Sequence, residues 1–237
     1  IGLLYRPFEP LGLFASYSES IAATGIKESG DSDELLAPTE GEQVEFGIKA
    51  TGFNDRLSGT LSAFRIDRDN VPVIDPDDQT RFVNGGLQRS RGIELDIVGN
   101  PLPQWRLQAA ATYIDAEVRE SNTLEKGTPL RNVPDYSASV ATRYRFNRGW
   151  MRGVELSGHV VTVDDRAGDD QNDFSLPSHT VASAFVSRDW TLGDQSLKTR
   201  IGVKNLADKT HYLASNAKSS VVPGRPRTVL GTVTLEF

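Results

Sequence analysis

Apolar and polar residues alternate with a period of two along most of this chain. In segment 44–50, Val44, Phe46 and Ile48 alternate with glutamate, glycine and lysine, and the same alternation recurs at 93–97. Successive side chains of a β-strand point to opposite faces, so this period predicts strands with one apolar and one polar face. No helical period of comparable strength occurs, and the chain is therefore predicted to be all-β.

The alternation divides the chain into eleven expected strands. Their bounds are 1–6, 11–20, 42–52, 57–70, 82–99, 105–119, 135–146, 151–164, 179–190, 196–212 and 225–237. The connections alternate strictly in length. Those at 8–10, 53–56, 100–104, 147–150 and 191–195 are short, whereas those at 21–41, 71–81, 120–134, 165–178 and 213–224 are long. One end of the sheet is therefore expected to carry tight turns and the other end long loops.

This asymmetry is typical of antiparallel transmembrane β-barrels of the outer membrane, which have short turns on one side and long loops on the other. A barrel strand needs only ~9 to 11 residues to cross the bilayer, whereas a spanning helix needs ~20 apolar residues, which the chain lacks. Aromatic residues that could lie in one headgroup layer gather near the short turns: Tyr5, Phe53, Trp105, Phe146, Trp150, Trp190 and Phe237. Tyr17, Tyr113 and Tyr212 could form the opposite girdle. A soluble all-β protein with an ordinary core is the competing interpretation of the strand pattern.

Composition narrows these possibilities. The 237 residues, 38% hydrophobic and 24% charged, are typical of an ordered protein of one large or two small domains. The absence of cysteine excludes disulfides and thiolate metal sites, and the net charge of -6 argues against nucleic-acid binding. The chain starts at Ile1 within an expected strand, which is typical of a piece of a longer protein.

Two C-terminal motifs resemble those of a known family. In the last segment, alternate residues from Val229 to Phe237 share one face, as in the terminal strand of outer-membrane proteins. Upstream, Gly202-Val-Lys-Asn-Leu-Ala-Asp-Lys-Thr-His-Tyr212 followed by Pro223-Gly-Arg-Pro-Arg-Thr228 resembles the end of a TonB-dependent receptor. Ala207 and His211 depart mildly from that pattern.

Further stretches resemble the ferric-siderophore branch of the same family, namely 63–71, 85–96, and 111–116 together with 132–135. The resemblance covers essentially the whole chain. It assigns structural roles to the motif residues Ser90, Gly92, Glu94, Asn205, Asp208, Gly224, Pro226, Arg227 and Phe237. Gly92 is expected to let its strand bend or bulge, and Glu94 to face the lumen between lipid-facing Ile93 and Leu95.

The resemblance implies that residues 1–237 are the C-terminal part of a 22-stranded barrel that encloses an N-terminal plug. The signal peptide, TonB box, plug and remaining strands would then lie outside this sequence. Eleven strands cannot stand alone in lipid, because unpaired backbone groups at the two edges cost several kcal/mol each. The missing strands are expected from the rest of the protein.

The same resemblance implies TonB-dependent uptake of a ferric siderophore across the outer membrane of a Gram-negative bacterium, and not an enzyme. Its implied partners are the TonB complex, acting through the plug, outer-membrane lipid and lipopolysaccharide, and the barrel-assembly machinery. The full-length protein is expected to be monomeric. No resident cofactor is expected, since the iron complex is cargo.

Candidate ligand contacts are loop-side cations and one phenol that could bind an anionic chelate: Arg68, Arg81, Arg131, Arg166 and Tyr212. The competing interpretation of the arginines is pairing with neighbouring carboxylates. The histidines His159, His179 and His211 lie in separate segments without metal-ligand spacing, so they are expected to be wall or rim residues, and no metal site is predicted.

Two loops are rich in carboxylates: Glu28, Asp31, Asp33 and Glu34 in one, and Asp164, Asp165, Asp169, Asp170 and Asp173 in the other. They could hold Ca²⁺ or bridge cations on lipopolysaccharide, but they lack EF-hand spacing, which favours solvated surface loops. Other functions remain open: a receptor of the same family for haem, cobalamin or an oligosaccharide, a passive porin, or a soluble all-β binding module.

Overall fold

The computed structural model describes residues 1–27, 34–75, 77–78, 80–193 and 195–236. Eleven strands form one antiparallel sheet in the order β1-β2-β3-β4-β5-β6-β7-β8-β11-β12-β15, while β9–β10 and β13–β14 form two small hairpins. The strands are β1 (Gly2–Phe8), β2 (Leu11–Ala22), β3 (Thr39–Gly52), β4 (Leu57–Ile74), β5 (Phe82–Leu102), β6 (Trp105–Glu120), β7 (Tyr136–Arg145), β8 (Val154–Val163), β9 (Arg166–Ala167), β10 (Ser175–Leu176), β11 (His179–Leu192), β12 (Gln195–Lys204), β13 (Tyr212–Ser215), β14 (Val221–Pro223) and β15 (Thr228–Glu236). In the described part of the chain, no helix is long and apolar enough to cross a membrane.

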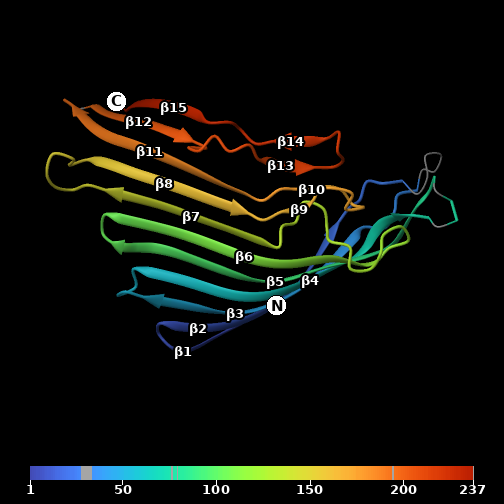
Figure 1. Ribbon diagram of the computed structural model, residues 1–237. Helices are drawn as coiled ribbons and strands as arrows, with labels where there is room; N and C mark the ends of the chain where they lie inside the picture. The colour runs from blue at the N-terminus through green and yellow to red at the C-terminus, as the bar shows by residue number, and fades with distance from the viewer. Residues whose placement is uncertain (28–33, 76, 79, 194, 237) are drawn as a thin grey trace.

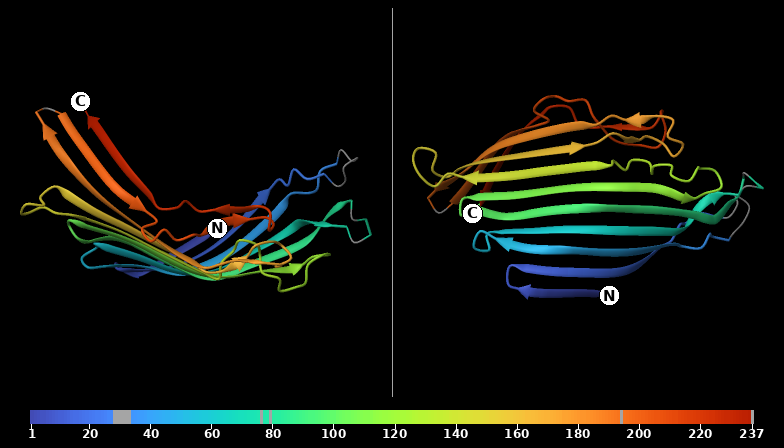
Figure 2. Two further views of the ribbon diagram at one scale, coloured as in Figure 1. Left: turned by 45° about the horizontal axis from the view of Figure 1, so that its top comes forward. Right: turned by 60° about the horizontal axis from the view of Figure 1, so that its bottom comes forward.

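The large sheet is strongly curved, and each main strand lies beside its neighbour in the sequence (Figure 1). Its two edges are β1 and β15, which lie far apart on opposite sides of the curved sheet (Figure 2). Tight turns connect the strands at one end, and the long connections with both small hairpins lie at the other end. We call these the turn end and the loop end. The expected all-β class, the eleven main strands and the two unequal ends are confirmed.

One expected strand, 196–212, is wrong in its second half, because β12 ends at Lys204. Asn205 and Asp208 adopt left-handed φ angles of 52° and 53°, which strand geometry excludes. The side chain of Asn205 then binds both backbone groups of Lys209, with its Nδ2 donating to the carbonyl at 2.9 Å and its Oδ1 accepting from the amide at 2.8 Å. These local bonds replace the strand ladder, so Tyr212 begins a separate hairpin.

The long loop expected at 71–81 begins later than expected, because its first four residues are strand. Val71 to Ile74 continue β4 and pair with residues 82–86 of β5, after register shifts on either side of Val71. Asn70, with a φ of 56°, precedes the first of these pairs. The extra residues are absorbed as bulges, which let the ladder continue beyond the expected strand end.

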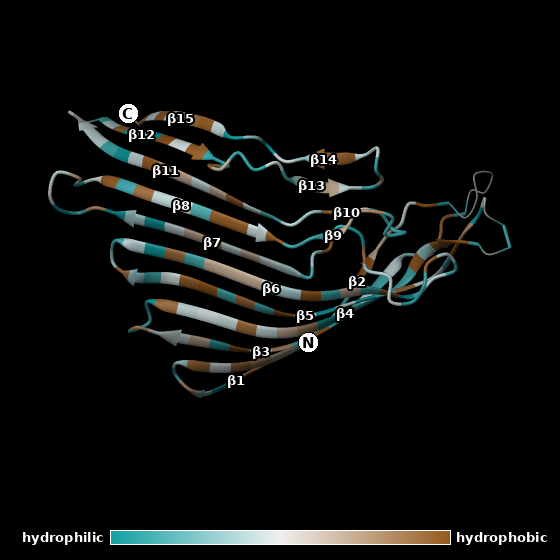
Figure 3. Cartoon of the chain, viewed as in Figure 1, coloured by the Kyte–Doolittle hydropathy of each residue, from teal (hydrophilic) through white to brown (hydrophobic). Residues whose placement is uncertain are grey.

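Hydrophilic and hydrophobic residues alternate along many of the strands (Figure 3). Because successive side chains point to opposite faces, the two faces of the sheet differ in polarity, as predicted. Phe46, Ile93 and Val233 are 62%, 52% and 71% exposed and belong to the outer face. Glu94 lies on the opposite, inner face, between Ile93 and Leu95. Only Ala116, Val118 and Leu176 are buried hydrophobic residues among those described, so backbone pairing rather than an apolar core holds this chain together.

On the outer face, tyrosines lie toward the loop end, and charged residues lie beyond them, nearer still to that end. Tyr113 on β6 packs against Tyr136 on β7 with ring centroids 4.9 Å apart. Tyr212, expected in this girdle, instead lies in β13 at the loop end. Beyond the tyrosines, the outer face carries ion pairs: Asp67 binds Arg89 and Arg65, each at 2.6 Å. Arg91 binds Asp115 at 2.7 Å. The apolar band therefore ends at the tyrosines.

Three glycines of the inner face each lie opposite a phenylalanine on the neighbouring strand. The directly paired residues are Phe14 with Gly47, Phe64 with Gly92, and Phe185 with Gly202. A Cβ at each of these glycines would overlap the ring or come within its contact distance. The ladder passes through Gly92 without a register shift, so Gly92 does not form a bulge, and the glycine makes room for Phe64.

Candidate ligand-binding site

Three long connections meet at the loop end through Asn132 and Ser215. Asn132 donates from Nδ2 to the Ser215 carbonyl at 2.8 Å and accepts the Ser215 amide at Oδ1 at 2.9 Å. The Asn132 amide also donates to the Ala167 carbonyl, and the Ser215 hydroxyl donates to the Gly168 carbonyl. Asn132 has a φ of 63°, a conformation that asparagine tolerates better than most residues. The connections after β6, β8 and β12 are therefore joined into one assembly.

Arg166, in β9, is buried in this assembly and only 6% exposed. Its Nη2 donates to the carbonyls of Tyr212 and Leu213 at 2.9 and 3.1 Å. Its Nη1 is also buried and has no hydrogen-bond partner among the described residues. No ion pair with a carboxylate is found for Arg166 in that part of the chain, and burial lowers the pKa of this guanidinium. A buried cation with an unused donor is poised to accept an anionic ligand.

Arg166 lines a cavity of about 440 Å³, which we call the loop-end cavity. Its wall includes Asn132, His159, His179, Ser183, His211 and Tyr212. The His179 and His211 rings lie with centroids 5.0 Å apart, and His211 Nδ1 lies 3.0 Å from the Lys209 carbonyl. The cavity thus gathers one guanidinium and three imidazoles on the inner face of the sheet.

The polypeptide after β12 positions His211 and the return to β15. Asn205, 3% exposed, also donates from Nδ2 to the Arg225 carbonyl at 3.1 Å. Asp208 accepts the Arg227 amide at Oδ1 at 2.7 Å. Through these bonds, the Asn-Leu-Ala-Asp stretch (205–208) and the Arg-Pro-Arg stretch (225–227) together close the base of the last long connection.

Gly224 lies against the His211 ring, and its amide donates to the His211 carbonyl at 2.8 Å. A Cβ at position 224 would overlap that ring. Glycine at this position therefore allows the imidazole to remain beside His179.

The five predicted ligand contacts do not all come together. Arg166 and Tyr212 both line the loop-end cavity. Arg131 pairs with Asp170 at 3.3 Å, as the competing interpretation of the arginines expects. Arg68 is exposed on β4 and donates to Gln88 at 3.4 Å, and Arg81 lies just before β5. Those three therefore belong to other parts of the loop end.

The remaining motif residues occupy structural positions. Ser90 and Glu94 lie in the β4–β5–β6 ladder, opposite Ile66 and Ser62 on β4. The Pro226 carbonyl accepts the Thr228 hydroxyl at 2.9 Å just before β15. Phe237 lies outside the described residues, as do Glu28, Asp31 and Asp33 of the first acidic loop.

In the second acidic loop, carboxylates mainly bind the loop's own backbone. Asp169 is 9% exposed and accepts the Asp173 amide at Oδ1 at 2.9 Å, while Asp164 accepts the Asp165 amide. Across the residues that the structure describes, no group of three or more His, Cys, Asp or Glu is arranged to hold a metal ion.

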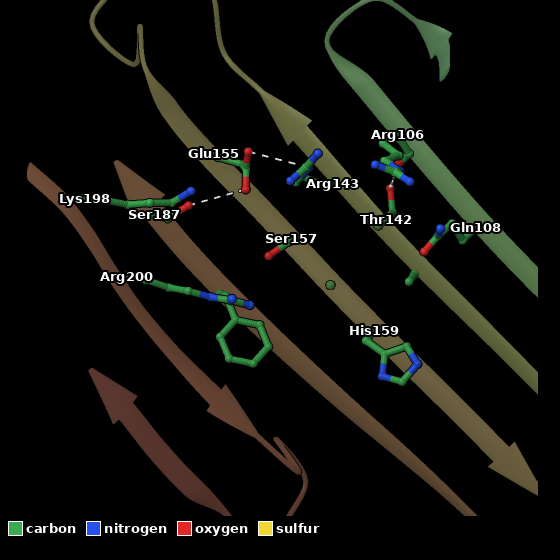
Figure 4. Close-up of a pocket in the computed structure, with 13 residues that line it drawn as sticks. Arg106, Gln108, Thr142, Arg143, Glu155, Ser157, His159, Ser187, Lys198 and Arg200 are labelled. Atoms are coloured by element: carbon green, nitrogen blue, oxygen red, sulfur yellow. Dashed lines mark hydrogen bonds and ion pairs between the residues drawn. The ribbon is translucent and has the colours of Figure 1, made fainter. Parts of the chain in front are cut away.

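A second hollow, the mid-wall cavity, lies further down the inner face and has a volume of about 390 Å³. Figure 4 shows Arg106, Arg143, Lys198 and Arg200 around it. Glu155 is the single carboxylate among the described residues of its lining and lies 3.7 Å from Arg143. His159 belongs to both cavities, so basic side chains continue along the wall from the loop end.

Sequence reasoning identified Arg166 and Tyr212 but missed the contacts that place them. Asn132 and Ser215 are separated by 83 positions, and no local pattern links them. His179 and His211 were assigned to the wall and rim without being brought together. One sequence feature could have pointed to the loop-end cavity: His211 stands where the family pattern has an aromatic residue.

A curved antiparallel sheet with an apolar outer face, a polar inner face, short turns at one end and joined loops at the other defines a segment of an outer-membrane β-barrel. The chain belongs to the TonB dependent receptor-like, beta-barrel family, whose model matches residues 1–206.

Relatives of this chain include named receptors. The metal-pseudopaline receptor CntO of Pseudomonas aeruginosa is 34% identical over 242 residues, which cover 100% of this chain and 33% of the relative. The ferrioxamine B receptor of Salmonella typhimurium is 29% identical over 239 residues, covering 99% of this chain and 33% of the relative. This chain thus spans about a third of the length of these curated relatives.

Solved structures agree with the fold. The ferric preacinetobactin receptor BauA of Acinetobacter baumannii has a TM-score of 0.82 and 25% identity, covering 98% of this chain and 35% of that chain. The siderophore receptor PiuA of the same organism has a TM-score of 0.84 at 22% identity, covering 99% of this chain and 35% of that chain.

Proposed function

We propose that this chain is the C-terminal barrel segment of a receptor that takes up a ferric siderophore across the outer membrane by TonB-dependent transport. The family match over residues 1–206 carries the proposal, since relatives along the full chain are receptors for ferrioxamine B, ferrichrome and pyoverdine. In this function the chain provides barrel wall, three joined loops and the last strand of the barrel.

The loop end is the side on which the proposed ligand first meets the protein. The loop-end cavity opens on the inner face, beside the joined loops, and the mid-wall cavity continues the cationic wall toward the turn end. Iron enters as cargo within its chelate, and the receptor holds no resident cofactor and catalyses no covalent step. The TonB complex and a plug would come from the rest of the protein.

An uptake experiment tests this function. The full-length gene is expressed in a Gram-negative strain that lacks its own siderophore receptors, and uptake of radioactive iron is measured from ferrichrome, ferrioxamine B and ferric pyoverdine. We expect uptake from at least one of these chelates, and its loss when the strain also lacks TonB.

Haemin, cobalamin and maltodextrin serve as comparison substrates in the same strain. Uptake of one of them, with none from the ferric chelates, would show that the receptor transports haem, cobalamin or an oligosaccharide rather than a ferric siderophore. Uptake that persists without TonB would contradict active transport and favour a passive pore.

A further inference from the structure

The loop-end cavity contains a buried cation, and the described residues that line it include no aspartate or glutamate. Arg166 is 6% exposed, and its buried Nη1 has no hydrogen-bond partner among the described residues. Leaving a buried charged donor unsatisfied is costly, so such a group is retained where a ligand completes it.

Among the described residues of the cavity lining, every ionisable side chain other than the Tyr212 phenol is basic. The lining contributes Arg166 from β9, His159 from β8, His179 from β11 and His211 from the connection before β13. No aspartate or glutamate is among the described residues of the lining. The field in the cavity therefore favours an anion and disfavours a free metal cation.

The donors suit an oxygen anion of small size. Guanidinium and imidazole N–H groups form charge-assisted hydrogen bonds with carboxylates. Apolar Val161, Val163 and Val181 also line the cavity. The volume of about 440 Å³ is that of a pocket for a small molecule or for one arm of a larger chelate.

We infer that the loop-end cavity binds a carboxylate group of the transported chelate, and that the receptor therefore selects carboxylate-bearing, anionic metal chelates. This inference rests on the proposed function, and it adds the chemical class of the substrate. The mid-wall cavity, with four cations and one carboxylate in its lining, extends the same preference along the wall.

A binding experiment on the purified full-length receptor tests the inference. Citrate is titrated at constant ionic strength, and its affinity is obtained from saturable stabilisation of the receptor against heat. Inorganic phosphate is titrated in parallel, because it is an oxygen anion without a carboxylate.

Ser183→Asp places a carboxylate in the cavity lining without removing Arg166 or its bonds to the β13 carbonyls. We expect this variant to weaken citrate binding about tenfold or more, because the new carboxylate occupies the cationic site and repels the ligand. Asparagine has the shape of aspartate without its charge, so Ser183→Asn is the size-matched variant and is expected to weaken citrate binding much less than Ser183→Asp. Ser58→Asp adds the same charge on β4 away from the cavity and is expected to bind citrate within about twofold of the wild type.

Three results would overturn the inference: no saturable binding of citrate, equal binding by wild type and Ser183→Asp, or binding of phosphate as tight as that of citrate. Failure of the proposed function is distinguishable, because citrate would then bind while no ferric siderophore is taken up. If only the inference fails, the receptor still takes up a ferric siderophore, but Ser183→Asp does not weaken citrate binding.

Discussion

The Asn132 side chain links two distant connections through a pair of hydrogen bonds to backbone groups, as neighbouring strands are linked in a sheet. Its amide group binds both backbone groups of Ser215, and its own backbone amide binds Ala167, so three connections depend on it. A left-handed φ of 63° adds a reason for asparagine at this position.

Asn132→Ala should therefore loosen the joined loops. Loss of two hydrogen bonds from partly buried groups costs about 1–3 kcal/mol, and we expect faster hydrogen exchange at 212–215 in the full-length receptor. Asn122→Ala is the matched control, since Asn122 makes a single exposed 3.4 Å bond to the Ile74 carbonyl. Equal exchange in both variants would show that Asn132 does not join the loops.

Asp67 makes the stability of the outer-face ion pairs depend on pH. Arg89 and Arg65 hydrogen-bond this carboxylate beyond the tyrosines and hold its pKa below the ordinary value of 3.8. Because the folded pKa is lowered, the stabilisation is fully present above the unfolded pKa and is lost as pH falls through the folded pKa.

Asp67→Asn should therefore reduce the stability of the β4–β5 hairpin by about 1 kcal/mol at neutral pH. The same substitution should have little effect once the pH falls below the folded pKa of Asp67. Urea unfolding of both proteins between pH 7 and pH 3 measures the difference. A difference that stays constant over this range would contradict the assignment to Asp67.

At the scale of single strands, the glycine–phenylalanine pairs fix how closely neighbouring strands pack on the inner face. At Gly92 the obstacle to a larger residue includes the backbone carbonyl of Tyr113, which cannot rotate away as a side chain can. Gly231 on β15, by contrast, has nothing within 4 Å of the position of a Cβ.

Gly92→Ala should destabilise the full-length receptor by about 1–3 kcal/mol, because the added methyl forces β5 and β6 apart. Gly231→Ala, the matched control, should change stability by no more than about 0.5 kcal/mol. Unfolding in urea from lipid vesicles gives both values. Equal effects of the two substitutions would mean that close packing at Gly92 is not required.

The strands also show how far sequence reasoning reaches. Alternation is a local property, so it predicted the eleven strands and the opposite facing of Ile93 and Glu94. It failed at Asn205, because strand ends depend on side-chain bonds to a backbone 20 residues away, such as the Arg225 carbonyl. The loop-end cavity could not be assembled in advance, since its members become neighbours only when distant connections meet.

For the whole molecule, the open edges of β1 and β15 dominate the energetics. In the described sheet each edge strand is paired on one side only. Exposed backbone donors and acceptors in hydrocarbon cost several kcal/mol each, and in water they pair with other chains.

Residues 1–237 expressed alone should therefore aggregate and give no folded, heat-modifiable band on gel electrophoresis in detergent. The full-length receptor, refolded in the same micelles, should give such a band. A monomeric folded band from residues 1–237 alone would show that the two edges can close without further strands.

The strands differ greatly in length, and the height of the barrel wall differs with them. At about 3.3 Å per residue, the 21 residues of β5 measure roughly 70 Å, whereas the 10 residues of β8 measure roughly 33 Å. With the usual tilt of about 40°, β8 rises roughly 25 Å, about the height of the apolar band of such barrels, while β5 rises roughly 54 Å and so extends nearly 30 Å beyond that band. The strand rim is consequently sloped, and its low side lies at the short strands β7, β8, β12 and β15, next to Arg166 and the joined loops. A bulky molecule arriving from outside would meet the high side as a barrier and find its shortest way to the interior over the low side.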